Sequence, residues 1–214
     1  MKISSGTELI DNLLCGGYEA VTTIYGPASS GKTLLCLLCA INTSLQEKKV
    51  IYVDTEKGFS LTRVKQLTPH YKEVMKNITF LKPITFAQQT KMIELLTKIR
   101  KRDLIIIDNI STLYRIELSK GTEIYETNKE LGIQLSCLNE ISKTIPVLIT
   151  NQVYISPDTH ETKMVAENII KYASNCVIEL QFFKEKRKAI IKKHPIIKDN
   201  AVYFKITEKG IIGC

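Results

Sequence analysis

Hydrophobic positions along the chain follow two recurring patterns. Short runs that are apolar throughout and rich in β-branched residues alternate with longer stretches in which apolar residues recur every three or four positions. The first pattern predicts strands buried on both faces, and the second predicts amphipathic helices. The predicted strands are 21–26, 49–56, 78–83, 103–109 and 145–152, and the predicted helices are 32–46, 90–102 and 127–144. We therefore expect an α/β fold with a mostly parallel, twisted sheet and helices on both of its faces.

The pattern changes after Asn151. Residues 153–166 are polar without periodicity, which predicts a loop. Two further apolar runs, 175–183 and 201–210, flank a basic segment and indicate C-terminal strands that extend the sheet as antiparallel hairpins. Because the chain has 214 residues and shows no linker or internal repeat, we expect a single domain spanning 1–214.

Composition narrows the class of protein. Lys and Arg total 30 and Asp and Glu 22, so positive charge exceeds negative charge by 8. The excess points to a polyanionic partner such as nucleic acid, or to surface lysine that serves solubility. No apolar run approaches the ~20 residues of a membrane helix, and the first residues lack the apolar segment of a secretory signal. These features predict a cytoplasmic protein with no membrane partner, and they predict that Cys36 and Cys39 are core thiols and not a disulfide or a zinc pair.

Residues 26–33 read GPASSGKT and satisfy the pattern G-x-x-x-x-G-K-[ST] between a predicted strand and a predicted helix. In such a loop, backbone N–H groups and the helix N-terminus surround a phosphate, the lysine places a positive charge on the β and γ oxygens, and the hydroxyl binds Mg²⁺. The segment therefore predicts binding of ATP with Mg²⁺. The candidate nucleotide-binding residues are Gly26, Ser29, Ser30, Gly31, Lys32, Thr33 and Leu34.

Polar side chains stand at the ends of the other predicted parallel strands. Glu56 and Asp108 each end an apolar strand, and Gln152 follows another. Ligands of open α/β sheets lie beyond the carboxyl ends of the strands, so these groups and the phosphate loop are expected at one edge. We interpret Asp108 as a carboxylate that holds Mg²⁺ together with Thr33. The alternative is a solvated strand-end acid or a helix cap.

The other two strand-end residues are candidates for catalysis. Glu56 can orient and polarise the water that attacks the γ-phosphate. Asp54 lies one pleat step away on the same side and competes for this role, but Glu56 lies further out along the edge. The terminal amide of Gln152 can hydrogen-bond a γ-phosphate and respond to its loss. A capping or surface glutamine is the alternative.

The segment KEKRKAIIKKHP concentrates positive charge near the C-terminus. If it forms a hairpin, its two basic clusters face each other and can contact a phosphate backbone. The alternative is an edge strand whose lysines prevent pairing between sheets. The candidate DNA-binding residues of this segment are Lys184, Lys186, Arg187, Lys188, Lys192 and Lys193.

The segments GPASSGKT, YVDTEKGF, LIIIDNISTLYR and LITNQV, in this order, resemble the core ATPase domain of the RecA-type recombinases, above all their archaeal and eukaryotic strand-exchange branch. The resemblance implies a RecA-like P-loop ATPase core. It assigns Asp108 to Mg²⁺, Glu56 to the attacking water and Gln152 to a sensor that links the ATP state to DNA. It also implies that a loop near Tyr114–Arg115 and the loop at 153–166 line DNA, which makes Arg115 a candidate DNA-binding residue.

The chain departs from a full recombinase at its start. Because 25 residues precede Gly26, we expect neither the N-terminal helix-hairpin-helix domain nor the tether that joins subunits into a filament. Relatives also use a basic residue of the C-terminal segment on a neighbouring subunit's ATP, a role open to Lys192 or Lys193, although Pro195 stands where core-only paralogues usually place an arginine.

These departures predict an accessory, core-only paralogue that binds ATP and DNA, hydrolyses ATP weakly and has little or no strand-exchange activity. The expected partners are DNA, preferably single-stranded, a RadA-type recombinase and a second copy in a homodimer. An alternative is an ATP-switched interaction module that modulates a recombinase without needing DNA. A phosphotransferase or a circadian-type ATPase fits less well, because the chain lacks an arginine-rich lid and an acceptor segment.

Overall fold

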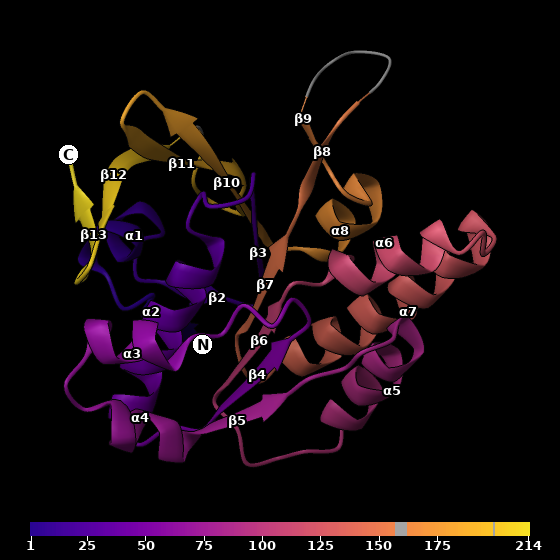
Figure 1. Cartoon of the computed structure of the whole chain (residues 1–214), viewed down its shortest axis with the longest axis horizontal. Helices are drawn as coiled ribbons and strands as arrows, with labels where there is room; N and C mark the ends of the chain where they lie inside the picture. Colours follow the sequence, from indigo (N-terminus) through magenta and orange to yellow (C-terminus); the bar gives the residue numbers. More distant parts are fainter. Residues whose placement is uncertain (157–161, 199) are drawn as a thin grey trace.

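The computed structural model describes residues 1–156, 162–198 and 200–214, and these residues form one large sheet flanked by helices (Figure 1). The sheet order is β13-β12-β11-β10-β3-β7-β6-β4-β5. The parallel strands are β3 (Val21–Tyr25), β4 (Val50–Asp54), β5 (Ile78–Leu81), β6 (Leu104–Asp108), β7 (Val147–Asn151) and β10 (Cys176–Phe183). The antiparallel extension is β11 (Lys186–Lys193), β12 (Ala201–Thr207) and β13 (Gly210–Gly213). The predicted fold class is therefore confirmed, including the C-terminal antiparallel strands.

Helices cover both faces of the sheet, as the alternating pattern predicted. One core lies under α1 (Glu8–Leu13), α2 (Lys32–Leu45), α3 (Leu61–Leu67) and α4 (Tyr71–Asn77). The other lies under α5 (Phe86–Leu96), α6 (Ser111–Ser119), α7 (Ile124–Ser142) and α8 (Glu167–Ala173). Two short ribbons complete the described chain, β1 (Lys2–Ile3) with β2 (Tyr18–Glu19), and β8 (Val153–Ile155) with β9 (Thr162–Met164). None of the helices formed by the described residues is long and apolar enough to cross a membrane.

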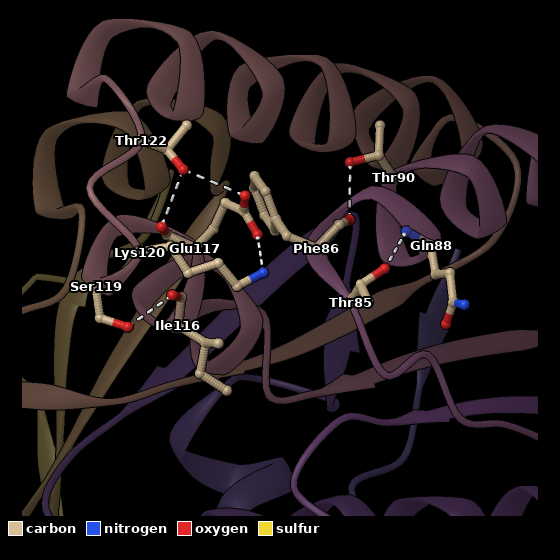
Figure 2. Close-up of polar contacts among 9 residues, drawn as sticks. All are labelled: Thr85, Phe86, Gln88, Thr90, Ile116, Glu117, Ser119, Lys120 and Thr122. Carbon is tan, nitrogen blue, oxygen red and sulfur yellow. Dashed lines mark hydrogen bonds and ion pairs between the residues drawn. The ribbon is translucent and has the colours of Figure 1, made fainter.

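The fifth helix begins and ends earlier than the predicted range 90–102. The Thr85 hydroxyl accepts a hydrogen bond from the backbone N–H of Gln88 at 3.2 Å, which caps the helix so that Phe86 is its first residue (Figure 2). The apolar periodicity alone does not locate this helix start, whereas the capping threonine does. At the other end the helix stops at Leu96, before the basic residues that the prediction included.

The predicted loop near Tyr114–Arg115 is wrong, because these residues belong to α6. Tyr114 is buried and packs edge-on against the ring of Phe86, with ring centroids 5.9 Å apart. The last turn of α6 is held by Glu117, which pairs with Lys120 at 2.8 Å and accepts a hydrogen bond from Thr122 (Figure 2). The resemblance implied a loop here, but the segment is helical because its apolar side chains pack on a neighbouring helix.

The polar segment at 153–166 was predicted to be a loop without regular structure. Its ends instead pair as the antiparallel strands β8 and β9, in register from Val153 with Met164 to Ile155 with Thr162. Residues 157–161, which contain Pro157, lie outside the described residues.

The basic segment does not form a hairpin by itself, so its two clusters do not face each other. Lys184, with a left-handed φ of 54°, forms the turn between β10 and β11. Lys186–Lys193 is then one continuous strand, because Ala189 and Ile191 in its middle pack into the core. The strand lies between β10 and β12, so it is not an edge strand either. The two basic clusters therefore lie at opposite ends of β11.

Candidate nucleotide site

The phosphate loop links β3 to α2 and passes close to β10. A Cβ on Gly26 would lie 2.5 Å from the carbonyl oxygen of Leu180, so a side chain there would collide with backbone. Gly31 adopts a left-handed φ of 110° as the N-cap of α2, and a Cβ there would lie 3.1 Å from Cδ1 of Ile206. The two glycines of the motif are thus required by close approach and by conformation.

Lys32 lies at the mouth of the loop. Its Nζ donates hydrogen bonds to the carbonyl oxygens of Gly26 and Pro27, each at 2.8 Å. Burial lowers the pKa of the Lys32 ammonium, while the carboxylates of Glu56 and Asp108 oppose this shift. An ammonium that has lost much of its hydration and is held only by neutral carbonyls is a strong binding group for an anion.

The remaining loop residues have distinct positions. Ser29 has a left-handed φ of 61° and lines the cavity with Thr33 and Leu34. The Ser30 hydroxyl is buried and has no hydrogen-bond partner among the described residues. The loop therefore brings an unused donor, the N-terminus of a 14-residue helix and an ammonium to one place.

Asp108 lies behind the loop at the end of β6 and is 3% exposed. It accepts hydrogen bonds from the Tyr52 hydroxyl at 2.7 Å and from the Thr150 hydroxyl at 2.5 Å. Burial raises the pKa of Asp108, and the hydrogen bonds from Thr150, Tyr52 and Thr33 counteract this shift. The contact with Thr33 joins the two residues that the sequence assigned to the metal.

Glu56 and Gln152 meet at the open edge of the sheet. The amide Nε2 of Gln152 and the hydroxyl of Thr112 both donate hydrogen bonds to Oε1 of Glu56, the latter at 2.6 Å. Arg115 donates from Nη1 to Oε1 of Gln152 at 2.8 Å. Asp54, in contrast, is buried and accepts the backbone N–H groups of residues 58 and 59. Of the two competing carboxylates, only Glu56 points into the open site.

Arg115 was predicted to contact DNA from a loop. The structure places it on α6, at the wall of the nucleotide cavity and bonded to Gln152. Thr112, one turn earlier on the same helix, was not identified from the sequence. A polar position next to the predicted loop was its only signal, and the resemblance had assigned that segment to DNA.

A cavity of about 890 Å³ unites these groups. Its wall contains the loop residues Gly26, Ser29, Gly31, Lys32, Thr33 and Leu34, together with Glu56, Arg115 and Gln152. Ala28 and Val153 also line it, as do Arg63 and residues 206–208, which sequence reasoning missed. Arg63 donates to the carbonyl oxygens of Thr207 at 2.6 Å and Glu208 at 2.9 Å, and so ties α3 to the turn after β12. A planar guanidinium beside the apolar Ile206 suits the flat base of a nucleotide.

The basic residues of β11 point in different directions. Arg187 donates from Nε and Nη2 to the carbonyl oxygen of Ser29, at 3.4 and 3.3 Å, and so braces the phosphate loop. At the far end of the strand, Lys192 lies 3.5 Å from the carboxylate of Glu179, and Lys193 donates to a backbone carbonyl of α8 at 2.7 Å. The six candidates therefore do not form one surface.

Comparison with known proteins decides the family. A sequence profile of the Rad51 family matches residues 1–214. The chain belongs to the Rad51 family. The predicted likeness to the RecA-type recombinases is thereby confirmed, and it extends over the whole of the sequence.

Several similar archaeal proteins carry the name DNA repair and recombination protein RadB, and two of them illustrate the likeness. The protein of Methanobrevibacter smithii is 40% identical over 221 residues, which cover 95% of this chain and 92% of that protein. The protein of Methanocaldococcus jannaschii is 36% identical over 211 residues, which cover 95% and 98%. A crystal structure of the RadB recombinase superposes with a TM-score of 0.82 at 32% identity and covers 98% of each chain. The RecA-like core predicted for this Rad51-family member is confirmed.

The buried carboxylate at the end of β6 gives a prediction for Asp108→Asn. A raised pKa means that the folded protein binds this proton more tightly than the unfolded chain, so stability falls as pH rises from the ordinary Asp value through the raised one. At neutral pH the neutral amide should therefore raise the Tm of the nucleotide-free protein by about 3 °C, while weakening Mg²⁺-dependent ATP binding by about tenfold.

Thermal unfolding between pH 3.5 and 8, with ATP titrations at pH 7.5, measures both effects of Asp108→Asn. The stability difference should vanish at the acidic end, where the wild-type carboxyl is protonated. A variant that is less stable at pH 7.5 than at pH 3.5, relative to wild type, would contradict the burial argument.

Proposed function

We propose that the chain is an ATP- and DNA-binding accessory protein of homologous recombination and DNA repair, with weak ATP hydrolysis and little or no strand exchange. The observation that supports it most is the cavity in which Lys32, Glu56 and Gln152 meet, with Asp108 directly behind. The names of the similar archaeal proteins support the biological process. We further propose that residues 1–214 form a single RecA-like ATPase domain.

The residues of the cavity fit ATP with Mg²⁺. Lys32 and the loop N–H groups would hold the phosphates, Thr33 and Asp108 the metal, and Arg63 with Ile206 the base. The close approach of Gly26 to β10 supports this fit, as does the buried Ser30 hydroxyl, which has no hydrogen-bond partner among the residues that the structure describes and so remains available to an anion. Bound Mg²⁺ neutralises the charge that develops on the transferred phosphoryl group.

The hydrogen bonds at Glu56 support a slow reaction. Hydrolysis needs a carboxylate and a phosphate-sensing amide that are both turned toward the γ-phosphate position. Oε1 of Glu56 already accepts two hydrogen bonds, from Thr112 and Gln152, and Arg115 occupies the amide oxygen of Gln152. Gln152 would have to leave Glu56 and Arg115 to reach a γ-phosphate in each turnover, and Thr112 holds the Glu56 carboxylate in its present orientation. We infer that hydrolysis is weak until another molecule disrupts this chain of hydrogen bonds.

DNA is the proposed polymeric partner, with a RadA-type recombinase as protein partner and a homodimer as the expected assembly. The excess of 8 positive charges supports DNA as a polyanionic ligand. A second candidate function is the ATP-switched interaction module. It is favoured by large apolar side chains exposed near the junction of α6 and α7, namely Ile116, Ile124 and Tyr125, of which Tyr125 is 73% exposed.

One experiment separates the two functions. Fluorescence anisotropy of a labelled single strand is recorded with and without ATP and Mg²⁺ across a salt series, beside pull-down of a RadA-type recombinase. ATP-dependent binding whose affinity falls steeply with salt supports the DNA-acting accessory protein. Absence of DNA binding at moderate salt, with an ATP-dependent recombinase complex that is lost in Tyr125→Ala, would replace it with the interaction module.

A further inference from the structure

Side chains alternate between two faces along the antiparallel strands β10 to β13. On one face Leu180, Ala189 and Phe204 are fully buried against the core under α1 and α2. The other face carries Phe183, Lys186, Lys188, Tyr203 and Lys205, which are paired across the strands or lie two residues apart along them. We call these five side chains the open face, because all of them are at least partly exposed to solvent.

Two aromatic rings lie at the centre of the open face. The Phe183 and Tyr203 ring centroids are 5.2 Å apart with an interplanar angle of 57°. The ammonium of Lys188 lies 5.5 Å from the centroid of the Tyr203 ring. Phe183 remains 46% exposed, so part of its ring is available to another molecule. A large aromatic side chain held open in this way, beside a second ring that fixes its position, is a platform for stacking.

Positive charge surrounds the two rings. Lys184 and Lys186 join Phe183 and Tyr203 around a hollow of about 530 Å³, which Glu185 and Cys214 complete. Lys188 and Lys205 lie on the neighbouring strands, and the acid among these residues, Glu185, is 3.9 Å from Lys205. Four lysines against one glutamate give this surface a net positive charge. Arg187 and Phe182 are not part of it, because they alternate to the opposite face, where Arg187 reaches the phosphate loop.

We propose that the open face binds single-stranded nucleic acid, with an unpaired base stacked on Phe183 and flanking phosphates on Lys186, Lys188 and the adjacent turn residue Lys184. This rests on the proposed function in taking nucleic acid as the partner, and it assigns the contact to one end of β11 and to rings that carry no charge. Stacking needs an exposed base, which a duplex does not offer, and an acidic protein segment would use the lysines but not the rings.

The test compares two neighbouring phenylalanines. Phe183→Leu keeps apolar bulk but removes the stacking surface, and should weaken binding of a labelled oligothymidylate about 5- to 100-fold. Phe182→Leu is the matched control, since Phe182 is 53% exposed and belongs to the opposite face of the same strand. The control should bind within about twofold of wild type, and ATP affinity measured on both variants reports that the fold is intact.

Charge is tested separately. Binding affinity falls with salt, and the slope of log affinity against log salt concentration should be smaller in magnitude by about 1.4 in Lys186→Gln/Lys188→Gln. Each phosphate contact on a single strand contributes about 0.7 to that slope. Lys72→Gln/Lys91→Gln, on the exposed surfaces of α4 and α5, is the charge-matched control and should leave the slope unchanged.

The outcomes separate this proposal from the proposed function. Wild-type binding that is equally retained by Phe183→Leu and Phe182→Leu overturns the open face and leaves a DNA-binding protein that uses another surface. Equal affinity for duplex and single strand, or loss in the lysine variant without loss in Phe183→Leu, also overturns it. Failure of the wild-type protein to bind either polymer defeats both. Selective loss in Phe183→Leu and in the lysine variant supports both.

Discussion

Replacement of Lys32 by alanine should weaken ATP binding by about 100-fold or more, because one charge-assisted contact to each of two phosphate oxygens contributes about 1.5–3 kcal/mol. The free protein should not lose stability. The Lys32 ammonium is partly buried and its pKa is lowered by that burial. Within the described part of the chain it donates hydrogen bonds to two carbonyls of its own loop. Removal of the ammonium relieves an unfavourable desolvation at neutral pH, so the Tm without nucleotide should stay equal or rise.

Calorimetric titration with ATP and Mg²⁺, paired with thermal unfolding of the free protein, measures both parts of this prediction. Lys48→Ala is the matched control, because Lys48 lies partly exposed beyond the other end of α2 and donates a hydrogen bond to Gln46. If Lys32→Ala bound ATP within about threefold of wild type, the cavity would not be a phosphate site of this class. Lys32→Arg should also bind weakly, since the planar guanidinium does not fit between the two carbonyls.

Replacement of Phe204 by alanine should lower the free energy of unfolding by about 3–5 kcal/mol. Phe204 is fully buried in the centre of β12, where it packs into the core under α2. Its ring also lies 3.8 Å from the position that a Cβ on Gly31 would take, so it supports the phosphate loop from below. The cavity left by alanine removes packing from the loop and from the sheet at once.

Denaturant unfolding and thermal unfolding check the Phe204→Ala prediction. For a chain of this size the Tm should fall by roughly 10 °C. Phe182→Ala is the control, since Phe182 is 53% exposed, and it should cost less than about 1 kcal/mol. A loss below that value in Phe204→Ala would mean that the antiparallel strands unfold apart from the parallel sheet. Saturating ATP should recover part of the lost stability, because ligand binding favours the folded protein.

The sequence could predict the parts of the site that are determined by residues adjacent in the chain. A strand that is buried on both faces reads as a run of apolar residues and ends at the first polar ones, so Glu56, Asp108 and Gln152 follow directly from the apolar runs before them. The phosphate loop is likewise a contiguous segment between a strand and a helix. Parallel pairing then brings these ends together, with Asp54 opposite Asp108 in the register. The roles given to these residues remain predictions.

The missed parts depend on contacts between distant segments. Arg63 reaches the cavity only because α3 packs beside the turn after β12, with residues 207 and 208 more than 140 positions away. No local pattern encodes that meeting. The basic segment was misplaced for a related reason, because positive charge suggested an exposed hairpin while burial of Ala189 and Ile191 required a strand packed on the core. Burial of the middle of a strand outweighs the charge at its ends.

The alternation of side chains along β11 separates two surfaces on one strand. Arg187 turns toward the phosphate loop, whereas Lys186 and Lys188, its immediate neighbours, turn toward solvent. A substitution at either lysine can therefore change what the outer surface recognises without altering the support of the loop. In a lineage under selection, ligand preference and nucleotide use can drift independently of each other. A scaffold with this separation can acquire new partners while its ATP site stays intact.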